Sequence, residues 1–259
     1  MRIVPIIKCT LYSSATLLRN RIVALLLLTI PLLFFTVTRY TTGTMPLFFK
    51  LASVSDQTTI SVPQRYMALV FIALAVAGLL SSLLSFYLIQ DQKSEHKRLI
   101  LCGFRSSEII LSKFILLMII IFVISVYTSF IIRIFFNPEN NWGLLLGFLL
   151  IGFVYGSYGM LIGTFSRGDL EGILFIVLLT NLDVGWLQNP VYFIGAQNKD
   201  FIKALPSFFP SQVGIVSAFS DFGISRSLIG SIIYGSAFLG TAMGIYYLRM
   251  RILRRHKIL

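Results

Sequence analysis

The chain has 259 residues, of which 56% are hydrophobic and only 12% are charged, and its mean hydropathy is +0.86. A soluble domain carries roughly 25% charged residues, so this composition excludes an ordinary soluble fold and requires a lipid environment. The net charge of +12 would suggest nucleic acid in a soluble protein. Here the Lys and Arg residues lie between apolar runs, which indicates membrane topology and argues against a nucleic-acid partner.

The first 20 residues are basic and amphipathic. Residues 2–20 place Ile3, Ile6, Ile7 and Leu11 among polar and basic positions. Such a segment is typical of a helix lying in the membrane interface, and the alternative is a plain juxtamembrane tail. No convincing small-residue cleavage site follows the first apolar run, so we expect no cleavable signal peptide.

Six apolar segments follow, and together they predict an all-α polytopic membrane protein with a single transmembrane domain over residues 1–259. About 20 residues are needed to cross a hydrocarbon core of about 30 Å. The expected spans are residues 22–38, 66–89, 114–136, 143–165, 172–188 and 227–248.

The distribution of basic residues sets the orientation. Fifteen of the 22 Lys and Arg residues fall at the two ends of the chain and in the loops 90–113 and 166–171. Six fall in the segments 39–65 and 189–226, and Arg133 lies within the third span. Because the richer side is cytoplasmic, both termini are expected inside the cell. Cys9 and Cys102 are then both cytoplasmic, which argues against a disulfide.

Small residues recur at about every fourth position in three of the spans. Such stripes let helices approach closely, and we interpret them as packing within one subunit. They are Ala73, Ala77, Ser81 and Ser85 in the second span, Gly152, Gly156, Gly159 and Gly163 in the fourth, and Ser236, Gly240 and Gly244 in the sixth.

Residues 90–113 form the longest run of mixed charge in the chain, and they lie between two apolar spans. Gly103 suits the left-handed position that commonly ends a helix. Ser106 or Ser107 can cap a new helix, and Glu108 in its first turn suits the positive end of the helix dipole. The pattern predicts a helix, a tight turn and a second helix held outside the bilayer, where a soluble partner can bind.

The fifth span differs from the others because Asn181 and Asp183 interrupt it. A carboxylate facing lipid near the midplane costs about 2.5–3.5 kcal/mol, so Asp183 should face protein or water. Arg133 is offset from it by about 12 Å along the membrane normal, counting 1.5 Å per residue, which disfavours direct pairing. Asp183 is therefore either a polar element of a translocation path or subunit interface, or a helix-end cap that holds the following segment.

That following segment, residues 189–226, is rich in proline and phenylalanine, including Phe208 and Phe209. This composition beside a membrane predicts a re-entrant region of short helices before the last span. The alternative is a folded extracellular loop that caps the bundle. With Asn181 and Asp183, Phe208 and Phe209 are the candidates for the translocation path or its outer gate.

Catalytic chemistry is not evident in the sequence. No GxxxxGK[ST] loop is present, and neither His96 nor His256 lies within a span. No pair of a nucleophile and a base is apparent. We therefore expect a non-catalytic chain without a cofactor or metal of its own. A gradient-driven transporter would need an internal repeat and ionisable groups within the membrane, and a membrane enzyme would need a catalytic constellation, so both are weaker alternatives.

The whole pattern resembles the membrane subunit of an ATP-binding-cassette exporter of the type-2 permease family. The architecture matches over nearly the whole chain, and the residue-level similarity concentrates in 95–113, where Glu95, Gly103, Glu108 and Lys113 have the family's spacing. Many members carry Thr-Pro where this chain has Cys102-Gly103, so no subfamily follows from the motif.

The resemblance implies a separate cytoplasmic ATPase subunit that binds ATP and docks on the 90–113 hairpin and the N-terminal helix. Two ATPase copies and two permease subunits, identical or different, would form the working unit in the inner membrane of a bacterium. The residues implied in coupling are Glu95, Arg98, Leu101, Gly103, Phe104, Arg105, Glu108 and Lys113. Among them we expect Leu101 and Phe104 to be apolar anchors of the docking surface, and Arg98, Arg105 and Glu108 to lie on its exposed rim. The start of the first span looks more like the drug, antibiotic or peptide exporters than the exporters of lipid-linked glycans, which are the alternative.

Overall fold

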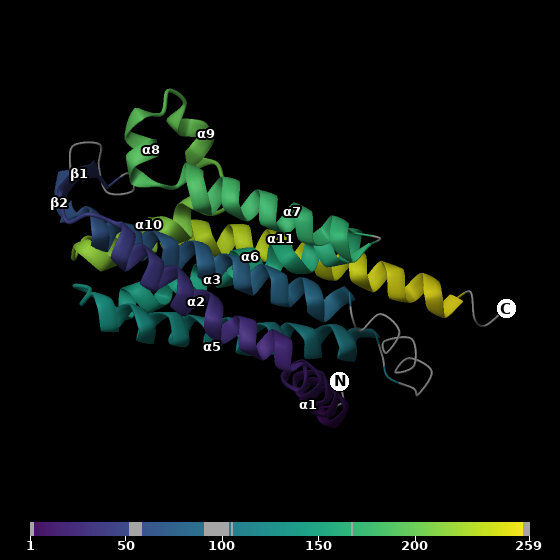
Figure 1. Ribbon diagram of the computed structural model, residues 1–259. Helices are drawn as coiled ribbons and strands as arrows, with labels where there is room; N and C mark the ends of the chain where they lie inside the picture. Colours follow the sequence, from purple (N-terminus) through teal and green to yellow (C-terminus); the bar gives the residue numbers. More distant parts are fainter. Residues whose placement is uncertain (1–2, 52–58, 91–103, 105, 167, 256–259) are drawn as a thin grey trace.

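The computed structural model describes residues 3–51, 59–90, 104, 106–166 and 168–255, and it has an all-α fold with one small sheet (Figure 1). Within this part of the chain, five helices are long and apolar enough to cross a membrane. These are α3 (Gln64–Gln90), α5 (Ser106–Phe135), α6 (Asn141–Phe165), the helix formed by α7 (Asp169–Leu182) with the π-helical turn η1 (Asp183–Leu187), and α11 (Ser225–Arg255).

Two helices precede this bundle and are almost continuous in sequence. α1 (Ile3–Arg19) lies across the ends of the long helices, whereas α2 (Arg21–Thr41) runs along them (Figure 1). α1 buries the stripe Ile6, Cys9, Ser13 and Leu17 against the bundle and leaves other apolar side chains such as Leu11 exposed. The expected N-terminal helix is therefore present as α1, with apolar side chains both on the face that packs on the bundle and on the exposed face.

The centre of the fold is the pair α3 and α6. All four small residues of the α3 stripe, Ala73 to Ser85 at every fourth position, are buried, and so are the glycines of the α6 stripe. A β-carbon at Gly159 would lie closer than 3.0 Å to the carbonyl oxygen of Ser82. The interpretation of these stripes as packing within one subunit is therefore confirmed for α3 and α6.

The stripe in α11 behaves differently. A β-carbon at Gly240 or Gly244 would meet nothing within 4 Å. The packing interpretation is therefore wrong for this third stripe, because Gly240 and Gly244 face outward, where α11 meets no other helix among the described residues.

A two-stranded antiparallel sheet lies at the end of the bundle opposite α1 (Figure 1). β1 (Pro46–Lys50) pairs with β2 (Thr59–Pro63), with Phe48 opposite Ser61 in register. Both strands bury alternate residues, including Phe49 and Val62, as expected for strands with one face against the core. This hairpin was not predicted from the sequence.

Three short helices occupy the same end of the bundle and connect η1 to α11. They are α8 (Pro190–Gly195), α9 (Lys199–Lys203) and α10 (Phe208–Phe219). α10 is buried over most of its length and packs closely on α6, where the β-carbon of a residue replacing Gly147 would collide with the backbone of Gly214. The end that carries β1, β2 and α8–α10 is called the outer end below, and the end that carries α1 is called the inner end.

Candidate functional site

The apolar helix α7 ends at an acidic residue, Asp183, where the backbone changes from α-helical to π-helical geometry. The backbone N–H of Gln188 donates to the carbonyl oxygen of Asp183 at 3.2 Å, which is the five-residue spacing of a π turn. Single π turns inside helices are frequent at functional sites. The turn brings both the backbone and the side chain of Gln188 back onto Asp183.

The carboxylate of Asp183 is completely buried, with 0% of its surface exposed, and it accepts four hydrogen bonds. The hydroxyl of Tyr155 on α6 donates to Oδ2, and the hydroxyl of Ser207 donates to Oδ1. The backbone N–H of Ser207 donates to Oδ2 at 3.1 Å, and the side-chain amide of Gln188 donates to Oδ1 at 3.3 Å. We call these four residues the Asp183 cluster.

This donor set matches the capacity of an ionised carboxylate, which only accepts and has about four lone-pair sites. In the described part of the chain no cation pairs with Asp183; its burial is offset by hydrogen bonds from neutral groups. Ser207 is the residue before α10, and Gln188 also donates to the carbonyl oxygen of Ile202 at 3.4 Å. The cluster therefore joins α6, the end of α7 and both ends of the segment that leads to α10.

The prediction that Asp183 faces protein rather than lipid is confirmed by its burial. Its bonds to Ser207 and Gln188 are those expected of the alternative in which it caps a helix end and holds the following segment. A role of Asp183 in translocation stays a prediction.

Asn181 and Arg133 lie outside the Asp183 cluster. Asn181 is exposed, and its side chain donates to the carbonyl oxygen of Val177 in its own helix at 2.8 Å. Arg133 is exposed near the outer end of α5 and donates to the side chain of Asn141 at 2.9 Å. Arg133 therefore does not pair with Asp183, as expected, and Asn181 and Asp183 face different sides.

Phe208 and Phe209 follow directly after Ser207 and extend the cluster into an aromatic layer. The Phe208 ring meets Phe209 at 5.4 Å between centroids, in an edge-on arrangement, and Phe193 of α8 at 6.3 Å. Phe209 contacts Tyr234 of α11 at 6.0 Å. Of the four residues predicted for the path or gate, Phe208 and Phe209 thus follow directly after a hydrogen-bond partner of the third, Asp183. The two phenylalanine rings connect α8 and α10 to α11.

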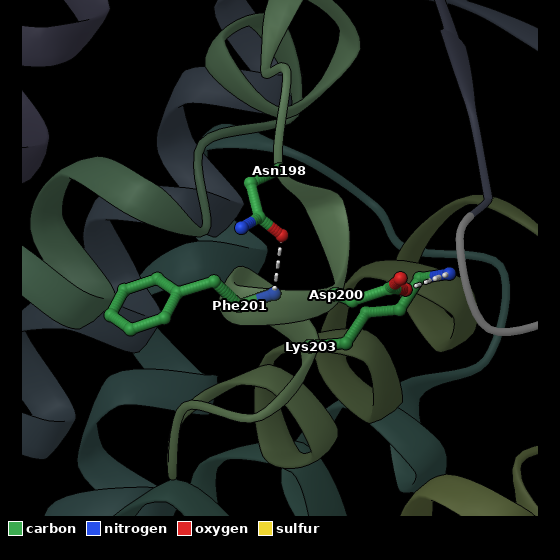
Figure 2. A network of polar contacts seen from close by, with 4 residues as sticks. All are labelled: Asn198, Asp200, Phe201 and Lys203. Atoms are coloured by element: carbon green, nitrogen blue, oxygen red, sulfur yellow. Dashed lines mark hydrogen bonds and ion pairs between the residues drawn. The ribbon is translucent and has the colours of Figure 1, made fainter.

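The short helix α9 lies on the surface of this outer segment. Asn198 caps it by accepting a hydrogen bond from the backbone N–H of Phe201 at 3.2 Å, and Lys203 pairs with Asp200 at 3.8 Å (Figure 2). The Asp200 side chain is 96% exposed, so this ion pair contributes little to stability. The buried contacts of Gln188 and Ser207 hold the segment, and Gln188 reaches α9 through the carbonyl oxygen of Ile202.

A hollow of about 350 Å³ lies at the outer end beside η1. Its apolar lining comes mainly from α3, including Met67 and Phe71. Uncharged polar side chains also line it, and these are Thr38, Thr42, Gln64 and Asn189. A hollow with this lining suits an uncharged amphiphilic group.

At the inner end, the start of α5 is joined to α1 by buried polar side chains. The ammonium group of Lys113, which is 1% exposed, donates to the hydroxyl of Ser13 at 3.0 Å. The hydroxyl of Ser112 lies 3.1 Å from the sulfur of Cys9. We call these four residues the α1–α5 clasp.

Of the residues implied in coupling, only three lie in the described part of the chain. Glu108 and Lys113 are both buried, so Glu108 does not occupy the exposed rim position expected for it. Phe104 is half-buried. The other five, Glu95, Arg98, Leu101, Gly103 and Arg105, lie outside the described residues.

Sequence reasoning missed Tyr155, Gln188 and Ser207, which complete the Asp183 cluster. Gln188 carried a signal, because it lies five residues after an acidic residue in an apolar run and directly before Asn-Pro. Tyr155 and Ser207 carried none, because they are 28 and 24 residues away from Asp183. No protein-family model and no curated protein sequence matches this chain.

Proposed function

We propose that this chain is the membrane-spanning permease subunit of an ATP-binding-cassette exporter, driven by a separate cytoplasmic ATPase. It works as a dimer of permease subunits with two ATPase copies, in the inner membrane of a bacterium. The observation that carries the proposal is the α1–α5 clasp. It joins the two segments that the resemblance assigns to ATPase docking, although Ser13 and Lys113 are 100 residues apart.

The clasp supports this function because of where α5 begins. α5 begins at Ser106, within the charged segment 90–113, and Lys113 at the end of that segment is in its second turn. Buried polar contacts between Lys113 and Ser13, and between Ser112 and Cys9, hold α1 to this turn. A force applied to the charged segment would therefore move α1 and α5 together. ATP-driven closure of the ATPases would shift the bundle by rigid-body motion of this kind.

We also propose that α2 is the first of six spans and that α8–α10 form a re-entrant region. α2 has 21 residues, which at 1.5 Å per residue gives about 31 Å, enough for a core of about 30 Å. The inner end is cytoplasmic in this proposal, since it carries the basic helix α1, the end of α3 that precedes the charged segment 90–113, and the basic end of α11 (Figure 1).

This topology predicts the accessibility of single cysteines to a membrane-impermeant reagent. Cysteines replacing Thr42 and Asn198 should be labelled from outside sealed cells, because both positions lie at the outer end. Cysteines replacing Ser94 and His256 should be labelled only after the cells are opened. Outside labelling at Ser94 would reverse the orientation and remove the basis for ATPase docking on the charged segment.

The proposed docking predicts that Phe104→Ala weakens ATPase binding far more than Lys97→Ala. Interface centres rely on buried aromatic anchors, whose loss typically costs 2 kcal/mol or more, whereas rim charges contribute little. About 2 kcal/mol corresponds to a roughly 30-fold weaker complex. The measurement is recovery of the ATPase subunit with the affinity-tagged permease, followed by ATP-dependent export in vesicles.

Lys97→Ala is the matched control, since it changes the same charged segment without removing an apolar anchor. If both variants retain the ATPase and full transport, the segment is a solvated loop and the proposal loses its docking site. The neighbouring reading frame gives an independent check, because an adjacent ATPase gene would support the same division of labour.

The cargo we propose is an amphiphilic drug, antibiotic or peptide rather than a glycan. What supports this is the outer hollow, whose lining of apolar and uncharged polar side chains suits a molecule with one apolar face. The separate aromatic layer of Phe193, Phe208 and Phe209 at the same end of the bundle points in the same direction.

A further inference from the structure

We propose that a groove between α2, α3 and α7 binds one acyl chain of an amine-headed phospholipid from the inner leaflet. The inference goes beyond the proposed function and does not depend on it. It rests on the shape, the depth and the charges of the groove.

The shape follows from how three helices pack. α2 and α7 both lie against α3 and leave a groove of about 340 Å³ over its surface. The walls are mainly aliphatic, from Leu26 and Ile30 of α2, Leu80 and Leu83 of α3, and Ile173 of α7, and the polar lining residues Tyr87, Gln90 and Asp169 are at the inner end. Apolar walls of this kind suit a saturated hydrocarbon chain.

The depth matches a single leaflet. Along α3 the lining runs from Leu80 to Gln90, which are ten positions apart and so about 15 Å apart along the helix axis. This is half of a hydrocarbon core of about 30 Å. Gln90 and Asp169 lie at the inner end of their helices, so the groove extends from the inner membrane surface to about the midplane.

Charged groups at the inner end select the head group. Asp169 lines the groove there and is exposed, so its carboxylate is placed to meet an ammonium group. The side-chain amide of Asn20 donates to the hydroxyl of Tyr87, which also lines the groove, at 3.3 Å. This contact brings Arg19 and Arg21, both exposed, to the same end as donors for a phosphate.

The test uses the full chain in lipid nanodiscs made of phosphatidylethanolamine and phosphatidylglycerol, with trace phosphatidylethanolamine carrying a diazirine in its acyl chain. After illumination, the labelled peptides are identified by mass spectrometry. We expect labelling concentrated on residues 26–30, 80–90 and 173. Ile173→Trp should reduce this labelling several-fold, because the indole fills the groove at a side chain that is already 40% exposed.

Ile233→Trp is the matched control, since Ile233 is 61% exposed on α11 and lies outside the groove. It should leave the labelling unchanged. For the head group, Asp169→Asn should lower the preference for phosphatidylethanolamine over phosphatidylglycerol by about two- to fivefold, the range for an exposed ion pair. Glu171→Gln, which changes an exposed acid in the same helical turn, should not.

Two results would overturn the inference. Labelling spread evenly over the lipid-facing sides of α7 and α11, or unaffected by Ile173→Trp, means that the groove holds no specific chain. An unchanged lipid preference in Asp169→Asn removes the amine-headed phospholipid as the ligand. Because no ATPase is present in the experiment, neither result bears on the proposed exporter function.

Discussion

Replacing Asp183 with alanine is expected to destabilise the folded chain by about 2–4 kcal/mol. The substitution leaves the donors of Tyr155, Ser207 and Gln188 buried without their acceptor. Side-chain hydrogen bonds in membrane proteins average about 0.6 kcal/mol and reach about 1.7 kcal/mol, and four are lost together here. The measurement is the free energy of unfolding in mixed micelles, from a denaturant titration.

Two milder substitutions should lower the free energy of unfolding by less than Asp183→Ala does. Tyr155→Phe removes one donor and should cost about 1 kcal/mol. Asp183→Asn keeps the shape but must point its oxygen at the backbone N–H of Ser207, which cannot turn around. The amide nitrogen of the introduced asparagine then faces the side chains of Ser207 and Gln188, and both would have to rotate to accept a hydrogen bond from it. The loss of stability in Asp183→Asn should therefore lie between the losses in Tyr155→Phe and Asp183→Ala.

Asn181→Ala is the matched control for this series. Asn181 lies two residues away on the same helix, but it is exposed and bonds only its own helix backbone. Its replacement should change stability by less than about 0.5 kcal/mol. If Asp183→Ala proves no less stable than Asn181→Ala, the cluster does not hold the outer segment in place.

The same variants separate the structural role of Asp183 from a role in export. A well-folded Asp183→Asn variant that exports at the wild-type rate would leave Asp183 only the structural role. A variant that folds but does not export would show that the negative charge itself is needed.

The long apolar helices could be predicted from the sequence because length and hydropathy are local properties. The second, third, fourth and sixth expected spans each fall within, or nearly within, one observed helix, α3, α5, α6 and α11. The fifth span was also predicted to be interrupted, since a carboxylate cannot face lipid cheaply. What could not be predicted was the form of the interruption, a π turn at Asp183.

The hairpin of β1 and β2 was not predicted, and the reason is different. Each strand has only five residues, and the strand Thr59–Pro63 buries one side chain fully, that of Val62. Strands this short give a weak alternation signal, and their stability comes from packing against the bundle. Phe49 illustrates this, because its ring meets Phe219 of α10 at 6.3 Å, a contact between residues 170 positions apart in the chain.

The Asp183 cluster and the α1–α5 clasp could likewise be predicted only in part. Glu108 and Lys113 could be singled out from their spacing, but the buried contact of Lys113 with Ser13 depends on α1, which is about 100 residues earlier in the chain. Asp183 could be singled out as an acid in an apolar run, but its partners come from α6 and from the segment before α10. Local patterns thus identified the residues, and only the packing of distant helices supplied the contacts.

That packing depends most strongly on the glycines of α6 where it meets α3. At Gly159 an added β-carbon would be closer than 3.0 Å both to the carbonyl oxygen of Ser82 and to the hydroxyl of Ser85. The Ser82 oxygen belongs to the helix backbone and cannot rotate away. The two helices would have to separate, and with them the buried apolar contacts between α3 and α6.

Gly159→Ala is therefore expected to destabilise the fold by about 3 kcal/mol, at the upper end of what overpacking a core costs. Gly240→Ala is the matched control, a glycine in the interior of another long helix with nothing within 4 Å of the new methyl group. There alanine should be neutral or stabilising by up to about 1 kcal/mol, because it favours the helix. Both free energies of unfolding can be measured in the same micelles. Equal effects of the two substitutions would mean that α3 and α6 are not in close contact at Gly159.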